Sequence, residues 1–118
     1  MCGPHEKTQL AVLWTRGDRE TADTMVYMYV RNANMNGWWR HITLIVWGPS
    51  ARLLAEDAEL QEKTKELMAI GVDVQACVDC AVMFGVADKL KELGVTVRGM
   101  GLPLTDMLQD EDWAVLSV

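Results

Sequence analysis

Two cysteines, Cys77 and Cys80, stand three positions apart in the segment QACVDCAVMFGV (75–86). Thiols at this spacing occur as redox pairs, as half of a metal site, as sulfur carriers, and as two small buried residues. In a reducing compartment a functional thiol acts as a thiolate nucleophile, as a metal ligand or in a transient disulfide. The spacing alone leaves these four interpretations open.

The position of the pair indicates how a thiolate could be stabilised. The cysteines fall where an apolar strand, 72–77, gives way to a predicted helix, 80–94. Unpaired N–H groups in the first turn of a helix, together with the helix dipole, favour the thiolate and lower the thiol pKa. Positive potential could come from three arginines in or beside the neighbouring loops: Arg16, Arg19 and Arg52. Asp79, between the two sulfurs, opposes this effect, and we expect the Cys77 sulfur to lie exposed at the mouth of a pocket.

The other candidate ligands favour neither a metal nor a nucleotide. His5 and His41 stand far apart, and no second pair of cysteines or histidines has zinc-ligand spacing. An iron–sulfur cluster usually takes more thiolates than the three cysteines of this chain. The segment GMGLPL (99–104) lacks the third glycine of a dinucleotide fingerprint, and the chain has no Walker-type phosphate loop. We therefore expect no metal and no resident cofactor.

Strands and helices alternate along the chain. Apolar runs predict strands at 9–14, 41–47, 72–77, 95–99 and 113–118, and helical spacing predicts helices at 19–36, 51–71, 80–94 and 102–110. This order predicts a three-layer α/β/α sandwich with a five-stranded, mainly parallel sheet and right-handed crossovers. The alternating segment 95–99 suits a sheet edge. We expect a flexible leader, 1–8, which contains Cys2, followed by one domain, 9–118.

This fold class also predicts where the site lies. Ligands of open α/β sheets bind just beyond the carboxyl ends of the strands. Besides Cys77 and Cys80, the residues that we expect to line a pocket there are Trp14, Arg16, Arg19, Trp47, Arg52, Asp79 and Met100.

Composition limits the partners. The net charge of −6 argues against nucleic-acid binding, which needs clustered Lys and Arg. No apolar run approaches the roughly 20 residues that span a bilayer, and the start MCGPHEKTQ lacks the pattern of a signal peptide. We therefore expect a soluble, cytoplasmic protein that binds neither nucleic acid nor a membrane.

Several features together resemble one family. They are the five strand–helix units, the segment QACVDCAVMFGV at the end of the third strand, and the C-terminal segment GMGLPLTDMLQDEDWAVLSV, in which a short helix leads into a last apolar strand. From about residue 9 to 118 the chain resembles the DsrE/DsrF superfamily of small α/β proteins, which includes the YchN-like proteins. That group contains sulfur-relay subunits of bacterial sulfur oxidation and of tRNA thiolation.

The resemblance implies roles for particular residues. It places the sulfur-carrying cysteine at Cys77, matches Gly85 to a glycine of the following helix, and gives some YchN-like members a second cysteine where Cys80 stands. One departure is Phe84, at a position where sulfur-relay members commonly have arginine. The resemblance also implies a homotrimer or hexamer, with the cysteine near a subunit boundary, and protein partners that donate and accept sulfur.

Two functional hypotheses follow. In the first, the protein is a persulfide carrier or a sulfurtransferase subunit: Cys77 accepts sulfane sulfur as a transient persulfide, and Cys80 releases that sulfur by closing a disulfide, or protects the site. In the alternative, an oligomeric binding module holds a small molecule or partner peptide between Trp14 and Trp47, and its cysteines are structural or redox-sensing. A thioredoxin-like reductase fits the spacing but requires the cysteine pair early in the chain.

Overall fold

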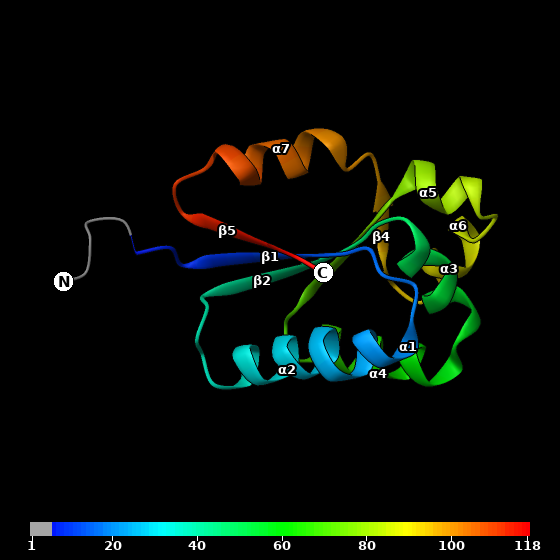
Figure 1. The fold of residues 1–118 in the computed structure, drawn as a ribbon, viewed down its shortest axis with the longest axis horizontal. Helices are drawn as coiled ribbons and strands as arrows, with labels where there is room; N and C mark the ends of the chain where they lie inside the picture. Colours follow the sequence, from blue (N-terminus) through cyan, green and yellow to red (C-terminus); the bar gives the residue numbers. More distant parts are fainter. Residues whose placement is uncertain (1–5) are drawn as a thin grey trace.

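A fully parallel five-stranded sheet forms the centre of the molecule. The computed structural model describes residues 6–118. The strands are β1 (Gln9–Trp14), β2 (His41–Val46), β3 (Asp73–Cys77), β4 (Thr96–Arg98) and β5 (Trp113–Ser117). They lie in the order β4-β3-β2-β1-β5, and every neighbouring pair is parallel. The predicted α/β sandwich is confirmed, with β4 at one edge (Figure 1).

Helices cover both faces of this sheet. They are α1 (Arg19–Thr21), the π-helix η1 (Ala22–Tyr27), α2 (Met28–Met35), α3 (Pro49–Glu56), α4 (Ala58–Ala69), α5 (Val78–Met83), α6 (Ala87–Glu92) and α7 (Gly101–Gln109). In Figure 1 η1, α2 and α4 lie below the sheet and α7 lies above it, while α3, α5 and α6 gather beyond the carboxyl ends of the strands.

Three of the predicted helices are interrupted. The helix predicted at 51–71 breaks at Asp57, whose backbone is extended (φ −109°, ψ 107°) and whose side chain accepts the Leu60 N–H at the start of α4. The helix predicted at 80–94 breaks after α5, where Gly85 adopts a positive φ of 69°. The helix predicted at 19–36 contains η1, whose hydrogen-bonding pattern is that of a π-helix.

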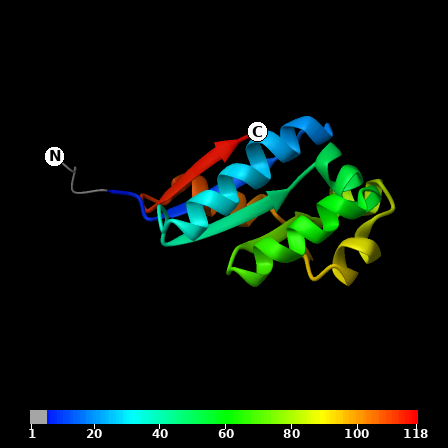
Figure 2. The same cartoon turned by 90° about the horizontal axis from the view of Figure 1, so that it is seen from below.

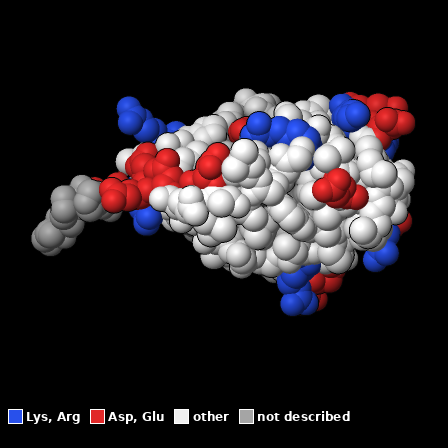
Figure 3. Space-filling view, turned by 90° about the horizontal axis from the view of Figure 1, so that it is seen from above, with Lys and Arg blue, Asp and Glu red and all other residues white. Residues whose placement is uncertain are grey.

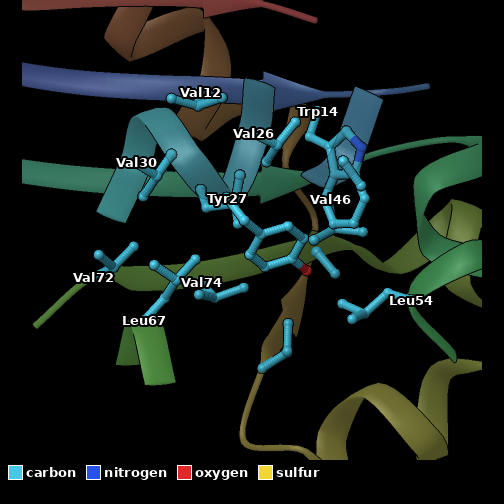
Figure 4. Close-up of a cluster of buried hydrophobic side chains, with 14 of the residues drawn as sticks. Val12, Trp14, Val26, Tyr27, Val30, Val46, Leu54, Leu67, Val72 and Val74 are labelled. Atoms are coloured by element: carbon cyan, nitrogen blue, oxygen red, sulfur yellow. The ribbon is translucent and has the colours of Figure 1, made fainter. Parts of the chain in front are cut away.

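Alternation along the strands divides the core between the two sheet faces. The larger cluster, between the sheet and η1, α2 and α4, contains Trp14, Val26, Tyr27, Leu44 and Leu67 (Figure 4). The smaller cluster, on the α7 side, contains Ala11, Ile45, Cys77, Met100 and Met107. The sheet therefore places Cys77 on the face opposite the larger cluster.

The first described residues contact the end of the chain. Thr8, within the predicted leader, donates its backbone N–H and its hydroxyl to Asp112 Oδ1, at 3.0 and 2.8 Å. Cys2 and His5 lie outside the described residues. Between residues 6 and 118, no helix has the length and apolar character needed to cross a membrane.

Candidate functional site

Hydrogen bonds join the carboxyl ends of β1 and β2. Ser50, fully buried in α3, donates its hydroxyl to the Trp14 carbonyl at 2.6 Å and accepts the Trp47 N–H at 3.1 Å. A Cβ at Gly17 would lie 2.9 Å from Pro49 Cβ, so the loop after β1 needs a glycine to pass this close to the start of α3. These contacts hold the loop after β1 against the loop that follows β2.

The two cysteines lie at the end of the next strand. Cys77 is the last residue of β3 and the N-cap of α5, with an extended backbone (φ −67°, ψ 120°). Its side chain is only 5% exposed, so the expectation of an exposed Cys77 sulfur is wrong for the single chain. Cys80, in α5, is partly exposed, and both residues are free thiols.

The surroundings of Cys80 keep that thiol protonated. Burial is the largest effect and raises its pKa above the ordinary value of 9.0. The Gly48 N–H donates to the sulfur and opposes this rise, whereas a hydrogen bond with Cys77 and the nearby Asp79 carboxylate both add to it. Near neutral pH Cys80 is therefore a thiol that shares a hydrogen bond with Cys77.

Apolar side chains from other parts of the chain belong to the same cluster as the pair. Cys77 and the fully buried Met100 belong to the same cluster, and Trp47 and Leu104 pack against it together with Cys80. Two of the predicted pocket residues, Trp47 and Met100, therefore lie in the cysteine cluster. This environment excludes water from the sulfur of Cys77.

The structure does not bring Trp14 or Arg19 to the cysteines. Trp14 is fully buried on the other face of the sheet, where its ring packs edge-on against Tyr27 with centroids 5.6 Å apart. Arg19 forms ion pairs with Asp23, Asp57 and Glu59, so its charge is already compensated. Strand parity explains the first result. Trp14 is in register with Val46, the last residue of β2, and both point to the same face, whereas Trp47, one residue later, points to the opposite face.

The remaining charged candidates are exposed. Arg16 pairs with Asp18 at 2.9 Å, and Asp79 is exposed on α5. The guanidinium carbon of Arg52 lies 5.3 Å from the centre of the Phe84 ring, at the C-cap of α5. A cation–π contact thus places a positive charge beside Phe84.

Sequence reasoning missed two contributors to the site. Gly48 has a positive φ of 71° and supplies the N–H that contacts Cys80. Leu104 reaches the cluster from α7, far along the chain. The segment GPS (48–50) marks a strand-to-helix turn, but its contact with Cys80 in α5 depends on the order of the strands in the sheet. Within residues 6–118, no group of three or more His, Cys, Asp or Glu could hold a metal ion.

Comparison with known proteins identifies the family. The sequence model of the DsrE/DsrF-like family matches residues 9–118. The chain belongs to the DsrE/DsrF-like family. The resemblance inferred from the sequence is thereby confirmed, and with it membership of a family generally related to sulfur relay. A search of curated proteins gave no match.

Three solved structures are similar to this DsrE/DsrF-like protein. A conserved protein of unknown function, BT1422 from Bacteroides thetaiotaomicron, has a TM-score of 0.89 and 40% identity over 94% of this chain and 95% of its own. MTH1491 from Methanobacterium thermoautotrophicum, also of unknown function, has a TM-score of 0.74 and 24% identity over 96% and 100%. The ychN protein from E. coli has a TM-score of 0.66 and 16% identity over 96% and 100%.

Proposed function

We propose that this DsrE/DsrF-like protein handles sulfane sulfur through Cys77 and Cys80. The observation that carries the proposal is the hydrogen-bonded pair of thiols at the end of β3. Cys80 stays protonated and can donate, so Cys77 is the sulfur positioned to act as the nucleophile. Family membership supports the same reaction class.

The proposed loading step transfers one sulfur atom. The Cys77 thiolate attacks the outer sulfur of a donor persulfide, forming a new S–S bond and breaking that of the donor, which leaves as a thiolate. Cys77 then carries a persulfide. The apolar cluster of Trp47, Met100 and Leu104 supports this role, because exclusion of water protects a reactive sulfur species.

Release can follow two routes. A partner thiolate can attack the outer sulfur of the persulfide, which returns Cys77 as the leaving thiolate. Alternatively, Cys80 attacks Cys77 Sγ and gives its proton to the departing outer sulfur of the persulfide, so that hydrosulfide leaves and a Cys77–Cys80 disulfide forms. The second route oxidises both cysteines and reduces the transferred sulfur, so a thiol reductant must then reopen the disulfide.

The proposal is tested by weighing the intact protein. All variants carry Cys2→Ser, and each is incubated with glutathione persulfide and weighed without reductant. The parent with both site cysteines should gain the mass of one sulfur and then lose it as the disulfide forms. Cys80→Ser should retain the added sulfur, and Cys77→Ser should gain none. Equal gain by Cys77→Ser and the parent would overturn the assignment.

The proposal includes assembly as a homotrimer or hexamer. Large apolar side chains are exposed on α5 and α7: Val82, Met83, Leu102 and Leu108. The face that carries α7 shows few charged groups away from its margins (Figure 3). A neighbouring subunit placed there would cover apolar surface beside the cysteines. Light scattering coupled to size exclusion measures the subunit number, and a monomer at all concentrations would contradict this part of the proposal.

One observation favours a second candidate function, a non-catalytic binding module. Cys77 is only 5% exposed, and burial raises the pKa of Cys80. Both facts would slow a reaction at these thiols in the isolated chain. Slow alkylation of both thiols in the assembled protein, together with no sulfur gain, would favour this reading.

A further inference from the structure

An arginine at the edge of the sheet lies beside Cys77. In the pairing of β3 with β4, Cys77 is in register with Arg98, the last residue of β4. Neighbouring strands lie about 4.8 Å apart, and register partners of parallel strands point to the same face. The preceding residue, Val97, packs against the larger core cluster, on the face where Figure 2 shows α2 and α4. Arg98 and Cys77 therefore share the other face of the sheet.

A buried glutamine fixes the position of the Arg98 guanidinium. Gln75 is only 7% exposed and stands two residues before Cys77, on the same face of β3. Its Oε1 accepts a hydrogen bond from Arg98 Nε at 2.8 Å, and its Nε2 donates to Asp73 Oδ2 at 2.6 Å. The guanidinium is thus tethered by its inner nitrogen to the strand that ends in Cys77.

The outer nitrogens of Arg98 have no partner in the described part of the chain. The side chain is exposed, and within residues 6–118 neither Nη1 nor Nη2 forms a hydrogen bond or an ion pair. These nitrogens carry the remaining N–H donors of the guanidinium, in a fork that matches the oxygens of a carboxylate or another oxyanion. Arg16 and Arg19 differ, because acidic side chains pair with both of them. Arg98 is therefore able to bind an external anion.

A local positive charge would matter for a sulfur donor that is an anion. The chain carries a net charge of −6, and the exposed Asp79 carboxylate lies between the two cysteines in sequence. Both features repel an anion that approaches Cys77. Arg98 opposes this repulsion from the side of β4, which is an edge strand of the sheet. An anionic donor is therefore favoured when it approaches Cys77 past Arg98.

We propose that Arg98 binds an oxyanion of the sulfur donor and so selects small anionic donors for Cys77. This inference rests on the proposed sulfur-handling function. Two donors have the required chemistry: glutathione persulfide, which carries carboxylates, and thiosulfate, which carries a sulfonate group. With thiosulfate, the Cys77 thiolate attacks the outer sulfur, the S–S bond of the donor breaks, and sulfite leaves with the electron pair of that bond. Arg98 donates hydrogen bonds to the oxygens on which the negative charge of the leaving group collects.

The first test compares donors of different charge. All variants carry Cys2→Ser and Cys80→Ser, so that Cys77 is the one remaining thiol, and sulfur loading is followed by intact mass against time. Arg98→Gln should slow loading from an anionic donor roughly tenfold or more, because it removes hydrogen bonds to a charged group. Loading from the neutral donor 2-hydroxyethyl persulfide should be unchanged. Slower loading from thiosulfate alone would assign Arg98 to a sulfonate, and slower loading from glutathione persulfide alone would assign it to a carboxylate.

The second test measures the anion site without any sulfur transfer. Iodoacetate and iodoacetamide both alkylate a thiolate by displacing iodide, and they differ by one negative charge. The ratio of the iodoacetate rate to the iodoacetamide rate at Cys77 should fall in Arg98→Gln by a similar factor. The iodoacetamide rate is the internal reference, because partial unfolding would raise both rates. Arg31→Gln is the matched control, since it removes an exposed arginine from α2, on the other face of the sheet, and it should leave the ratio unchanged.

The two tests separate the anion site from the sulfur function. If Cys77 gains no sulfur from any donor but its alkylation ratio still depends on Arg98, the proposed function fails and the anion site stands. An alkylation ratio that is equal in the parent and in Arg98→Gln would overturn the anion site, whether or not sulfur is gained. Equal slowing of anionic and neutral donors in Arg98→Gln would also overturn it, because the effect would then not depend on the charge of the donor.

Discussion

The hydroxyl of Tyr27 provides a sharp test of the core on the η1 side. Thr64 donates its own hydroxyl to the Leu60 carbonyl at 2.8 Å, so the hydrogen bond of 2.7 Å between Tyr27 and Thr64 has Tyr27 as donor. Tyr27→Phe keeps the ring against Trp14 and removes this one bond. We expect the free energy of unfolding to fall by about 1 kcal/mol near neutral pH. Truncation to alanine should cost about 3–5 kcal/mol.

At high pH the effect of Tyr27→Phe on the free energy of unfolding should change sign, so that the variant becomes more stable than wild type. Burial raises the pKa of Tyr27 above its ordinary value of 10.0, because the phenolate would lose its hydration. The folded chain then keeps the proton while the unfolded chain loses it. This contribution to stability is complete below the unfolded pKa and falls above it by about 1.4 kcal/mol per pH unit. Tyr27→Phe lacks this loss, so the two stability curves should cross about one pH unit above the unfolded pKa.

Urea unfolding followed by tryptophan fluorescence measures both effects. Tyr29→Phe is the matched control, because Tyr29 is only partly buried and accepts a hydrogen bond from Trp39 Nε1 at 3.1 Å. This control should show no crossing with wild type. Parallel curves for wild type and Tyr27→Phe up to strongly alkaline pH would refute the argument that burial holds the phenol neutral.

Three carboxylates give further predictions. Asp57→Ala removes the cap that accepts the Leu60 N–H and should lower the free energy of unfolding by about 1 kcal/mol. Asp57→Asn can still accept this hydrogen bond and should retain most of that stability. Equal losses of stability for the two variants in urea unfolding would contradict this prediction. Asp79→Asn should lower the pKa of Cys80 and so speed its alkylation near neutral pH, and an unchanged rate would speak against the charge effect. Hydrogen bonds from Gln9 and Thr8 hold the pKa of Asp112 below its ordinary value of 3.8. The contribution of Asp112 to stability is therefore present above that pH and is lost as the pH falls. In Asp112→Ala the free energy of unfolding, measured against pH, should decrease less steeply in acid than in wild type.

The inner strands were predictable from the sequence because they are buried on both faces. β1 and β2 lie inside the sheet and are covered on both faces, so 9–14 and 41–47 read as continuous apolar runs. The break at Asp57 was not predicted, because helical apolar spacing continues across it and only the capping aspartate marks it. No residue of η1 marks it in the sequence as a π-helix rather than an α-helix.

The site was predictable in position but not in its lining. Cys77 and Cys80 could be placed at the end of β3, since a strand end follows from local pattern. Which tryptophan joins them depends on strand parity and on which face each helix covers. Trp47 shares the cysteine face and Trp14 does not, and both facts depend on contacts between distant segments. The burial of Cys77 in one cluster with Met100 likewise depends on contacts between distant segments.

The unequal depth of the two sulfurs sets an order for oxidation. A peroxide arriving from solvent reaches Cys80 more readily than Cys77, which has only 5% of its surface open, although the raised pKa of Cys80 slows its oxidation. The sulfenic acid formed there would already be within hydrogen-bonding reach of a second thiol. Condensation of the two expels water and gives a reducible bond in place of an irreversible sulfinic acid. The inner cysteine is thus a built-in safeguard for the outer one.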